Sequence, residues 1–215
     1  MKKIILIAAI IFLTLISLLL IFGRAFPSFI SITNLSNDAS YLKLDNDIFF
    51  RQTLNNCGPY SVMAVVNILA DKRLDPENLS KEMTWRIYKN LTFPQGVINL
   101  LHKYDLKTKE FVLKNKKDTE KVIWLKSQID QGQPVILLIK IHHILHYITV
   151  VGYNENGFMI YDSMQEKDIN NPRKTIVDNG CLSGNRFYSY DELIKLWNDG
   201  GYKIFFKNWA VVCYK

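Results

Sequence analysis

Cys57 occupies a place in the sequence where a thiol could act as a nucleophile. It opens the segment CGPYSVMAVVNILADK, whose apolar residues recur at helical spacing and whose first turn holds Gly58 and Pro59. At a helix start, unpaired backbone N–H groups and the positive end of the helix dipole lower the pKa of a thiol. The same N–H groups can donate to a carbonyl oxygen that becomes negative under attack, and Gln52, five residues upstream, could add a side-chain donor. The pattern therefore predicts attack of a Cys57 thiolate on a carbonyl.

A histidine and an aspartate at the ends of two successive predicted strands could assist this thiol. His146 is the first residue of HYITVVGY, and Asp162 lies near the end of GFMIYDS. If the loop between them holds an odd number of residues, such as Tyr153 to Gly157, antiparallel pairing places both side chains on one face as direct or diagonal neighbours. A strict two-residue Asn-Gly hairpin would place them on opposite faces. On one face, the carboxylate would fix the imidazole tautomer and leave the other ring nitrogen to accept the thiol proton.

Each of these residues also has a purely structural interpretation. A cysteine at the start of an apolar helix can be a small buried hydrophobic residue. Asp162 could be a turn residue and Gln52 a residue of a surface loop. For Cys57, the matching histidine and aspartate segments favour the chemical interpretation over the structural one.

The other histidines and cysteines suggest further kinds of site. His142, His143 and His146 form H-H-x-x-H, which could bind zinc, but no nearby cysteine or carboxylate completes a familiar ligand set. No pair among the three cysteines has C-x-x-C spacing. We therefore expect no metal and no cofactor. In an oxidising compartment, Cys181 and Cys213 are the only pair that could form a disulfide and leave the candidate nucleophile free.

The composition is that of one ordinary globular domain. The chain has 215 residues, of which 48% are hydrophobic and 22% charged, so it is neither a collagen-like repeat nor a disordered tail. The net charge is +7, but Lys2, Lys3 and Arg24 flank one apolar segment and contribute three of these charges. The remainder is only mildly basic, so we expect no nucleic-acid partner.

The N-terminal segment indicates export. Residues 4–22 carry no charge, and a helix of that length measures roughly 28 Å, close to the thickness of the hydrocarbon core. Lys2 and Lys3 precede it and only Arg24 closely follows, which places the N-terminus in the cytoplasm and the remainder outside. The sequence GRA after the run is an acceptable cleavage site, so residues 1–25 are either a transmembrane anchor or a signal peptide. A buried core helix is disfavoured because the segment lacks a polar face. We expect a single-pass cell-membrane protein with its C-terminal domain outside, or a secreted protein if the segment is cleaved.

The elements after this segment predict an α+β domain. Residues 26–40, rich in Ser and Asn, are predicted to form a linker, and residues 41–215 one domain. Residues 41–50 alternate like an edge strand, and PVILLIKI, HYITVVGY, GFMIYDS and KIFFKNWAVVCY read as the strands of the second half. Helices are predicted over residues 57–72, 76 to about 89 after an Asp75 cap, 95 to about 104, 119 to about 131 after an Asp118 cap, and from Asp191. Helices first and an antiparallel sheet second are typical of the α+β class.

Two of these segments together resemble a known family. The sequence QTLNNCGPYSVMAVVN is similar to the nucleophile segment of papain-like cysteine peptidases of the bacteriocin-processing, C39-like superfamily, where a Gln precedes Cys-Gly-Pro at a helix start. HYITVVGYNENGFMIYDS resembles the histidine segment of that superfamily, and YSYDELIKLWNDG resembles its following helix. The resemblance implies a papain-like fold in which a helical N-terminal half packs on an antiparallel sheet. It also implies four roles: Cys57 as nucleophile, His146 as base, Asp162 as orienting acid and Gln52 as oxyanion donor.

The sequence departs from that superfamily in two respects. Gln52 lies five residues before the cysteine, where papain-type enzymes usually have six. No ATP-binding cassette follows, so the resemblance does not imply a peptidase-exporter that cuts double-glycine leaders inside the cell. We expect an exported or membrane-anchored thiol hydrolase that cleaves a peptide (amide) bond of a peptide or protein through an acyl-enzyme. The alternatives are an acyl or peptidyl transferase with the same triad, a non-catalytic peptide-binding module on the same fold, and a membrane-anchored structural or immunity protein, in which Cys57 would react with an alkylating reagent no faster than an ordinary thiol.

Overall fold

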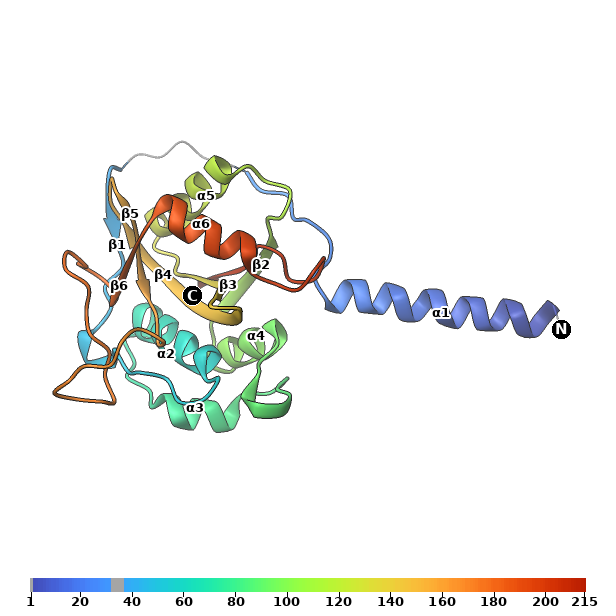
Figure 1. The fold of residues 1–215 in the computed structure, drawn as a ribbon, viewed down its shortest axis with the longest axis horizontal. Coiled ribbons are helices and arrows are strands. Elements are labelled where there is room, and N and C mark those ends of the chain that lie inside the picture. The colour runs from blue at the N-terminus through green and yellow to red at the C-terminus, as the bar shows by residue number, and fades with distance from the viewer. Residues whose placement is uncertain (1, 32–36) are drawn as a thin grey trace.

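The computed structural model describes residues 2–31 and 37–215, which form a long N-terminal helix and a domain with helices on both faces of a sheet (Figure 1). Helix α1 (Lys2–Phe22) projects away from the domain. Its segment Ile5–Phe22 is long and apolar enough to cross a membrane, and none of that segment is buried against the domain.

One antiparallel sheet, whose strands do not follow the order of the sequence, forms the centre of the domain. The strands run in the order β2-β7-β3-β4-β5-β6, and the short β1 pairs with the end of β4. The bounds are β1 (Ser40–Tyr41), β2 (Lys107–Val112), β3 (Val135–Ile141), β4 (Ile144–Tyr153), β5 (Gly157–Tyr161), β6 (Arg186–Ser189) and β7 (Trp209–Tyr214).

Helices cover both faces of this sheet. Helices α2 and α4 pack on one face with α3 outside them, and α5 and α6 pack on the other (Figure 1). The bounds are α2 (Cys57–Ala70), α3 (Pro76–Glu82), α4 (Pro94–Lys103), α5 (Asp118–Asp130) and α6 (Tyr190–Asp199), with short 3₁₀ turns at Asn46–Ile48 and Tyr88–Asn90. The predicted α+β class and antiparallel sheet are confirmed, and helices also cover the second face.

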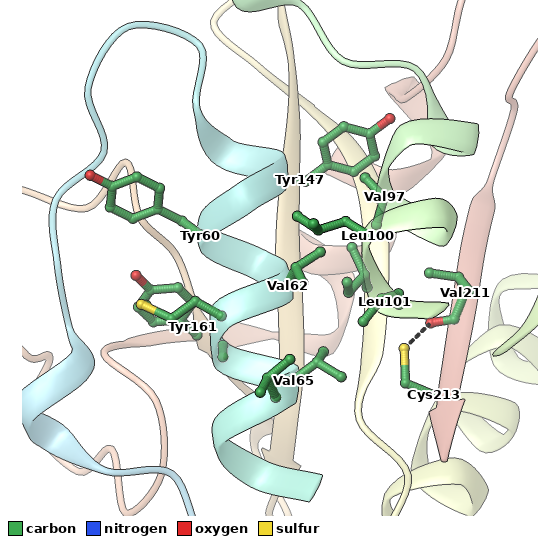
Figure 2. Packing of buried hydrophobic residues seen from close by; sticks show 14 of the residues in the cluster. Tyr60, Val62, Val65, Val97, Leu100, Leu101, Tyr147, Tyr161, Val211 and Cys213 are labelled. Atoms are coloured by element: carbon green, nitrogen blue, oxygen red, sulfur yellow. Dashed lines mark hydrogen bonds between the residues drawn. The ribbon is translucent and has the colours of Figure 1, made fainter. Parts of the chain in front are cut away.

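The sheet separates two hydrophobic cores, which explains its nearly continuous apolar strands. In β3, Ile136 and Leu138 pack beneath α2 and α4, whereas Leu137 and Ile139 pack beneath α5 and α6. A strand covered on both faces loses the alternation of a half-exposed strand. Figure 2 shows the first core, in which side chains of α2 and α4 meet those of the sheet. Because this core surrounds α2, Cys57 is held on a rigid element.

Two predicted elements have different bounds in the structure. The helix predicted from residue 76 to about 89 ends at Glu82, because the chain turns away and Trp85 adopts a φ of 52°. The strand predicted over residues 41–50 is reduced to a two-residue pairing with β4, since Asn46–Ile48 is a 3₁₀ turn capped by Asp45. Residues 83–93 form a loop that lies beside the start of α2.

The helix starts and the smaller strands also differ in detail. Asp118 is the first residue of α5 and not its cap, because the cap position is Lys117, whose backbone N–H bonds to the Glu120 carboxylate. Helix α6 is capped by Ser189 and begins one residue before Asp191. Strands β2 and β6 were not predicted.

The described part of the predicted linker lies against the domain. The backbone N–H of Ser28 donates to the carbonyl of Val112 over 2.8 Å, and the Val112 N–H donates to the Ser28 hydroxyl over 2.9 Å. Residues 32–36 of that linker lie outside the described residues.

Candidate active site

Cys57 is the first residue of α2 and is almost completely buried. Burial raises the pKa of its thiol, but the His146 imidazole and the backbone N–H groups of Tyr147 and Gly58 lower it further than burial raises it. The pKa of Cys57 therefore lies below the ordinary value of a thiol, which makes the thiolate easier to form than on an ordinary cysteine.

The turn before Cys57 is fixed by a network that sequence reasoning missed. The Asn56 side chain donates to the Thr53 hydroxyl over 2.6 Å, and its carbonyl oxygen accepts from the Ser80 hydroxyl over 3.0 Å. The Arg86 guanidinium donates to the same Asn56 oxygen and to the Ser80 hydroxyl. Arg86 lies in the loop that was predicted to be helical, so the sequence carried no signal for this contact.

His146 and Asp162 form a buried hydrogen-bonded pair. Nε2 of His146 lies 2.7 Å from Oδ1 of Asp162, and both side chains are inaccessible to solvent. Burial lowers the pKa of His146, but the Asp162 carboxylate and the Cys57 thiolate outweigh it and raise that pKa. Nδ1 of His146 is buried and has no hydrogen-bond partner among the described residues. With Nε2 bound to the carboxylate, Nδ1 is left as the nitrogen that can exchange a proton with Cys57.

A β-bulge places these two residues on one face of the sheet. The pair of β4 and β5 nearest the turn is Tyr153 and Phe158, and the even number of residues between them, 154–157, would by itself put His146 and Asp162 on opposite faces. One extra residue in β4, between Val150 and Gly152, shifts the register. The position opposite Asp162 then lies two residues along β4 from His146, on the same face. The predicted diagonal contact is confirmed, but the expected cause, an odd-numbered loop, is wrong.

Asp162 is held by partners on other segments. Its Oδ1 also accepts from the backbone N–H of Met164 over 2.8 Å, and its Oδ2 accepts from the Arg186 guanidinium over 2.9 Å. Burial raises the pKa of Asp162, but His146, Arg186 and the Met164 N–H together lower it below its ordinary value. The side chain of Asn185 bonds both the N–H and the carbonyl of Asp162. Asn185 and Arg186 were not identified from the sequence, because no pattern marks the start of β6.

Gln52 lies beside the same site. Its side-chain oxygen accepts from the Ser163 hydroxyl over 2.8 Å, and its backbone N–H donates to the Ser163 carbonyl over 2.8 Å. With the oxygen engaged, the amide nitrogen of Gln52 is the group that can donate to a ligand. The structure thus brings Gln52, Cys57, His146 and Asp162 together.

Two adjoining cavities meet at Gln52. An apolar cavity of about 370 Å³ reaches Cys57 and His146 and is walled by residues that include Ile87, Leu91 and Phe206. A more polar cavity of about 590 Å³ lies on the other side of Gln52, and its lining includes Arg51, Tyr60, Glu77 and Arg173. Gln52, Asn55 and Met164 border both cavities. Together they form a cleft in which an extended chain could cross the thiol.

The remaining cysteines and histidines lie elsewhere. Cys181 and Cys213 are free thiols, and they lie near β6 and in β7, which three strands separate in the sheet, so the suggested disulfide is not formed. His142 and His143 form the two-residue turn between β3 and β4 and are exposed. Within residues 2–31 and 37–215, no group of three His, Cys, Asp or Glu side chains is arranged to hold a metal ion.

Comparison with known proteins gives a family and a fold. The family model described as "Peptidase_C39 like family" matches residues 41–181, which include all four of these residues. A solved structure described as a C39-like peptidase from Bacillus anthracis has 13% identity and a TM-score of 0.54, with 83% of this chain and 98% of that chain covered. A double glycine motif protease from an AMS/PCAT transporter, in complex with the leader peptide, has 13% identity and a TM-score of 0.52, with 82% and 95% covered. No curated protein sequence matches.

Proposed function

The chain belongs to the Peptidase_C39 like family, and we propose that it is a membrane-anchored cysteine peptidase whose catalytic domain lies outside the cytoplasm. Cys57 is the nucleophile, His146 the proton carrier, Asp162 the orienting carboxylate and Gln52 an oxyanion donor. The observation that carries the proposal is the 2.7 Å bond from His146 Nε2 to Asp162, which leaves Nδ1 for the thiol at the start of α2.

Acylation follows from the positions of these groups. The sulfur of Cys57 attacks the peptide carbonyl carbon, and the carbonyl oxygen becomes an oxyanion stabilised by the N–H groups at the start of α2 and by Gln52. As the C–N bond breaks, Nδ1 of His146 gives its proton to the leaving amine, and a thioester remains on Cys57. Arg186 is a positioning residue, since it holds the carboxylate that holds the imidazole.

Deacylation uses the same imidazole in the opposite direction. The neutral imidazole accepts a proton through Nδ1 from a water molecule, whose oxygen attacks the thioester carbon. The C–S bond breaks, the carboxylic acid leaves, and the thiolate and imidazolium are restored. A peptide is the ligand that the cleft supports, since an apolar cavity at the thiol adjoins a more polar cavity beside Gln52, and the AMS/PCAT transporter protease of the same fold was solved with a leader peptide.

The location rests on α1. Its apolar length and the two lysines at its N-terminal end support a single membrane crossing with the N-terminus in the cytoplasm.

The test is covalent labelling by an activity-based probe that carries an electrophilic peptide warhead. We expect labelling of the wild-type protein at Cys57 and none of Cys57→Ala, together with release of cleaved products from a peptide library by the wild type alone. Labelling that is unchanged in Cys57→Ala, or products that are equally abundant with that variant, would contradict the proposal.

A further inference from the structure

Exposed apolar and aromatic side chains gather at one end of the cleft. They come from two loops, residues 83–93 and residues 200–206, and Ile87, Leu91 and Tyr202 also line the cavity that reaches Cys57. We call this group the apolar rim, and its exposed members are Trp85, Ile87, Tyr88, Leu91, Tyr202 and Ile204. An exposed apolar patch of several large side chains usually marks a surface that binds a partner or a membrane.

The end of α1 is seated on the apolar rim. The ring of Phe22, the last residue of α1, stacks on the ring of Trp85 with 6.1 Å between centroids. The backbone N–H of Phe206 donates to the carbonyl of Gly23 over 2.9 Å. A side chain at Gly23 would overlap the Phe205 ring, so the chain leaves α1 in close contact with this loop.

Arg24, just after α1, also holds the end of this helix against the domain. Its guanidinium donates to Glu110 of β2 over 2.8 Å and to Gln95 of α4 over 2.7 Å, and the Arg24 side chain is mostly buried. The orientation of α1 relative to the domain is therefore set by stacking, backbone bonding and an ion pair. If α1 crosses a bilayer, the two loops that carry the apolar rim lie at the level where the helix leaves it, because Trp85 of one loop contacts Phe22 and Phe206 at the end of the other bonds to Gly23.

The side chains of the apolar rim suit the headgroup region of a bilayer. Trp and Tyr are enriched at this depth, because the apolar ring can contact the lipid while the polar N–H or O–H group contacts water and headgroups. Both loops carry a Tyr-Lys pair: Lys89 Nζ lies 5.2 Å from the Tyr88 ring centroid, and Lys203 Nζ lies 5.5 Å from that of Tyr202. These exposed ammonium groups can bind anionic lipid headgroups while their aromatic neighbours enter the interface.

We infer that the apolar rim docks on the outer surface of the bilayer that α1 spans. This rests on the proposed anchor, and it adds a direction to the proposed site: the apolar end of the cleft opens at the lipid surface. The peptide bonds that reach Cys57 then belong to chains held at the membrane, either emerging from it or bound to its surface.

The test uses tryptophan fluorescence of the full chain in lipid vesicles. Trp85 is exposed whereas Trp124, Trp197 and Trp209 are buried, so Trp85→Phe removes the native tryptophan that faces outward. In that background, Ile204→Trp reports on the apolar rim. The matched control is Ile169→Trp, another exposed isoleucine, in the loop between β5 and β6 on the side of the domain away from α1 (Figure 1).

Both variants are reconstituted in vesicles of phosphatidylcholine and phosphatidylglycerol, with or without a phosphatidylcholine brominated near the top of its acyl chain. We expect the brominated lipid to reduce emission of the Ile204→Trp protein and to leave that of Ile169→Trp unchanged. Co-flotation of the protein with vesicles is measured in the same samples.

The outcomes separate this inference from the proposed anchor and from catalysis. Flotation with no loss of emission at position 204 overturns the docking surface, leaves the anchor standing and indicates another occupant such as a partner protein. Failure to float overturns both. Because neither readout depends on turnover, loss of catalytic labelling at Cys57 has no effect on either result.

Discussion

Replacement of Asp162 by asparagine perturbs the most deeply buried charge of the proposed triad. Asp162 is wholly inaccessible, and its two oxygens accept from the His146 ring, the Met164 N–H and the Arg186 guanidinium. The amide of Asp162→Asn has one acceptor oxygen and one NH₂ group, so the NH₂ group must face either the imidazole or the guanidinium, both of which are donors.

The size of the effect follows from burial. Removing one partner of a buried, hydrogen-bonded ion pair costs about 3–5 kcal/mol, because the remaining charges stay desolvated and unpaired. Since 1 kcal/mol shifts the Tm of a domain of this size by about 2–4 °C, the Tm should fall by about 6–20 °C. The imidazole also loses the carboxylate that fixes its tautomer, so kcat should fall by roughly 10²–10⁴ while some activity remains.

The loss of stability should depend on pH with a defined sign. The pKa of Asp162 is lowered in the folded protein, so its contribution to stability is present above the ordinary carboxyl pKa of about 3.9 and is lost as pH falls through the folded value. The pKa of His146 is raised, so its contribution is present below about 6.5 and is lost as pH rises through the folded value. The difference between wild type and Asp162→Asn should be large near pH 6 and should shrink in acid.

The assay is thermal unfolding in detergent, followed by near-ultraviolet circular dichroism across this pH range. The matched control is Asp47→Asn, because Asp47 is an exposed carboxylate whose ion pair with Arg73 is worth about 0–1 kcal/mol. The reasoning would be refuted if Asp162→Asn lowered the Tm no more than the control variant does. It would also be refuted if the difference in Tm between wild type and Asp162→Asn grew in acid.

Substitutions at the other site residues should separate effects on turnover from effects on stability. Cys57→Ser should abolish turnover but change the free energy of unfolding by less than about 1 kcal/mol, as measured by urea denaturation, since the N–H groups beside the sulfur can donate to a hydroxyl. Gln52→Ala should lower kcat by roughly 10²–10³ with little change in KM, whereas Ser163→Ala, which only frees the amide, should cost less in the same kinetic assay. Arg186→Met should move the acid limb of the pH–rate profile to higher pH, because it raises the pKa of Asp162, and Arg186→Lys should restore the profile. An unchanged pH–rate profile in Arg186→Met would show that Arg186 is not a positioning residue for Asp162.

The proposed triad could be predicted because each member lies at the end of a strongly patterned element. The apolar period of α2 identified Cys57 as a helix start, and the apolar runs of β4 and β5 placed His146 and Asp162 close to their ends. Their contact was predicted correctly for the wrong reason. The bulge between Val150 and Gly152 leaves no mark in a sequence of consecutive apolar residues, so the register could not be read from the loop length.

The parts that sequence reasoning missed depend on contacts between distant segments. Arg186 reaches Asp162 from a strand that is too short to show a pattern. The helical pattern of α3 continues through Trp85 and Ile87, and only the fold shows that these apolar residues line a cleft and the end of α1 instead of a core. Apolar periodicity indicates that a residue is covered in the folded protein. It does not indicate whether the covering partner is the core, a ligand or another segment of the chain.

The most direct test of the central claim is the pH dependence of Cys57 alkylation, read by mass spectrometry of the peptide that contains it. The other thiols interfere little, because burial raises the pKa of Cys181 to about 11 and that of Cys213 well above its ordinary value.

If His146 holds Cys57 as a thiolate, the alkylation rate of the wild type should change little between about pH 6 and pH 8. In His146→Ala, the alkylation rate should fall about tenfold for each unit by which the pH is lowered from 8 to 6, as for a thiol of pKa about 8.5. A wild-type rate that falls with pH as steeply as that of His146→Ala would contradict the account.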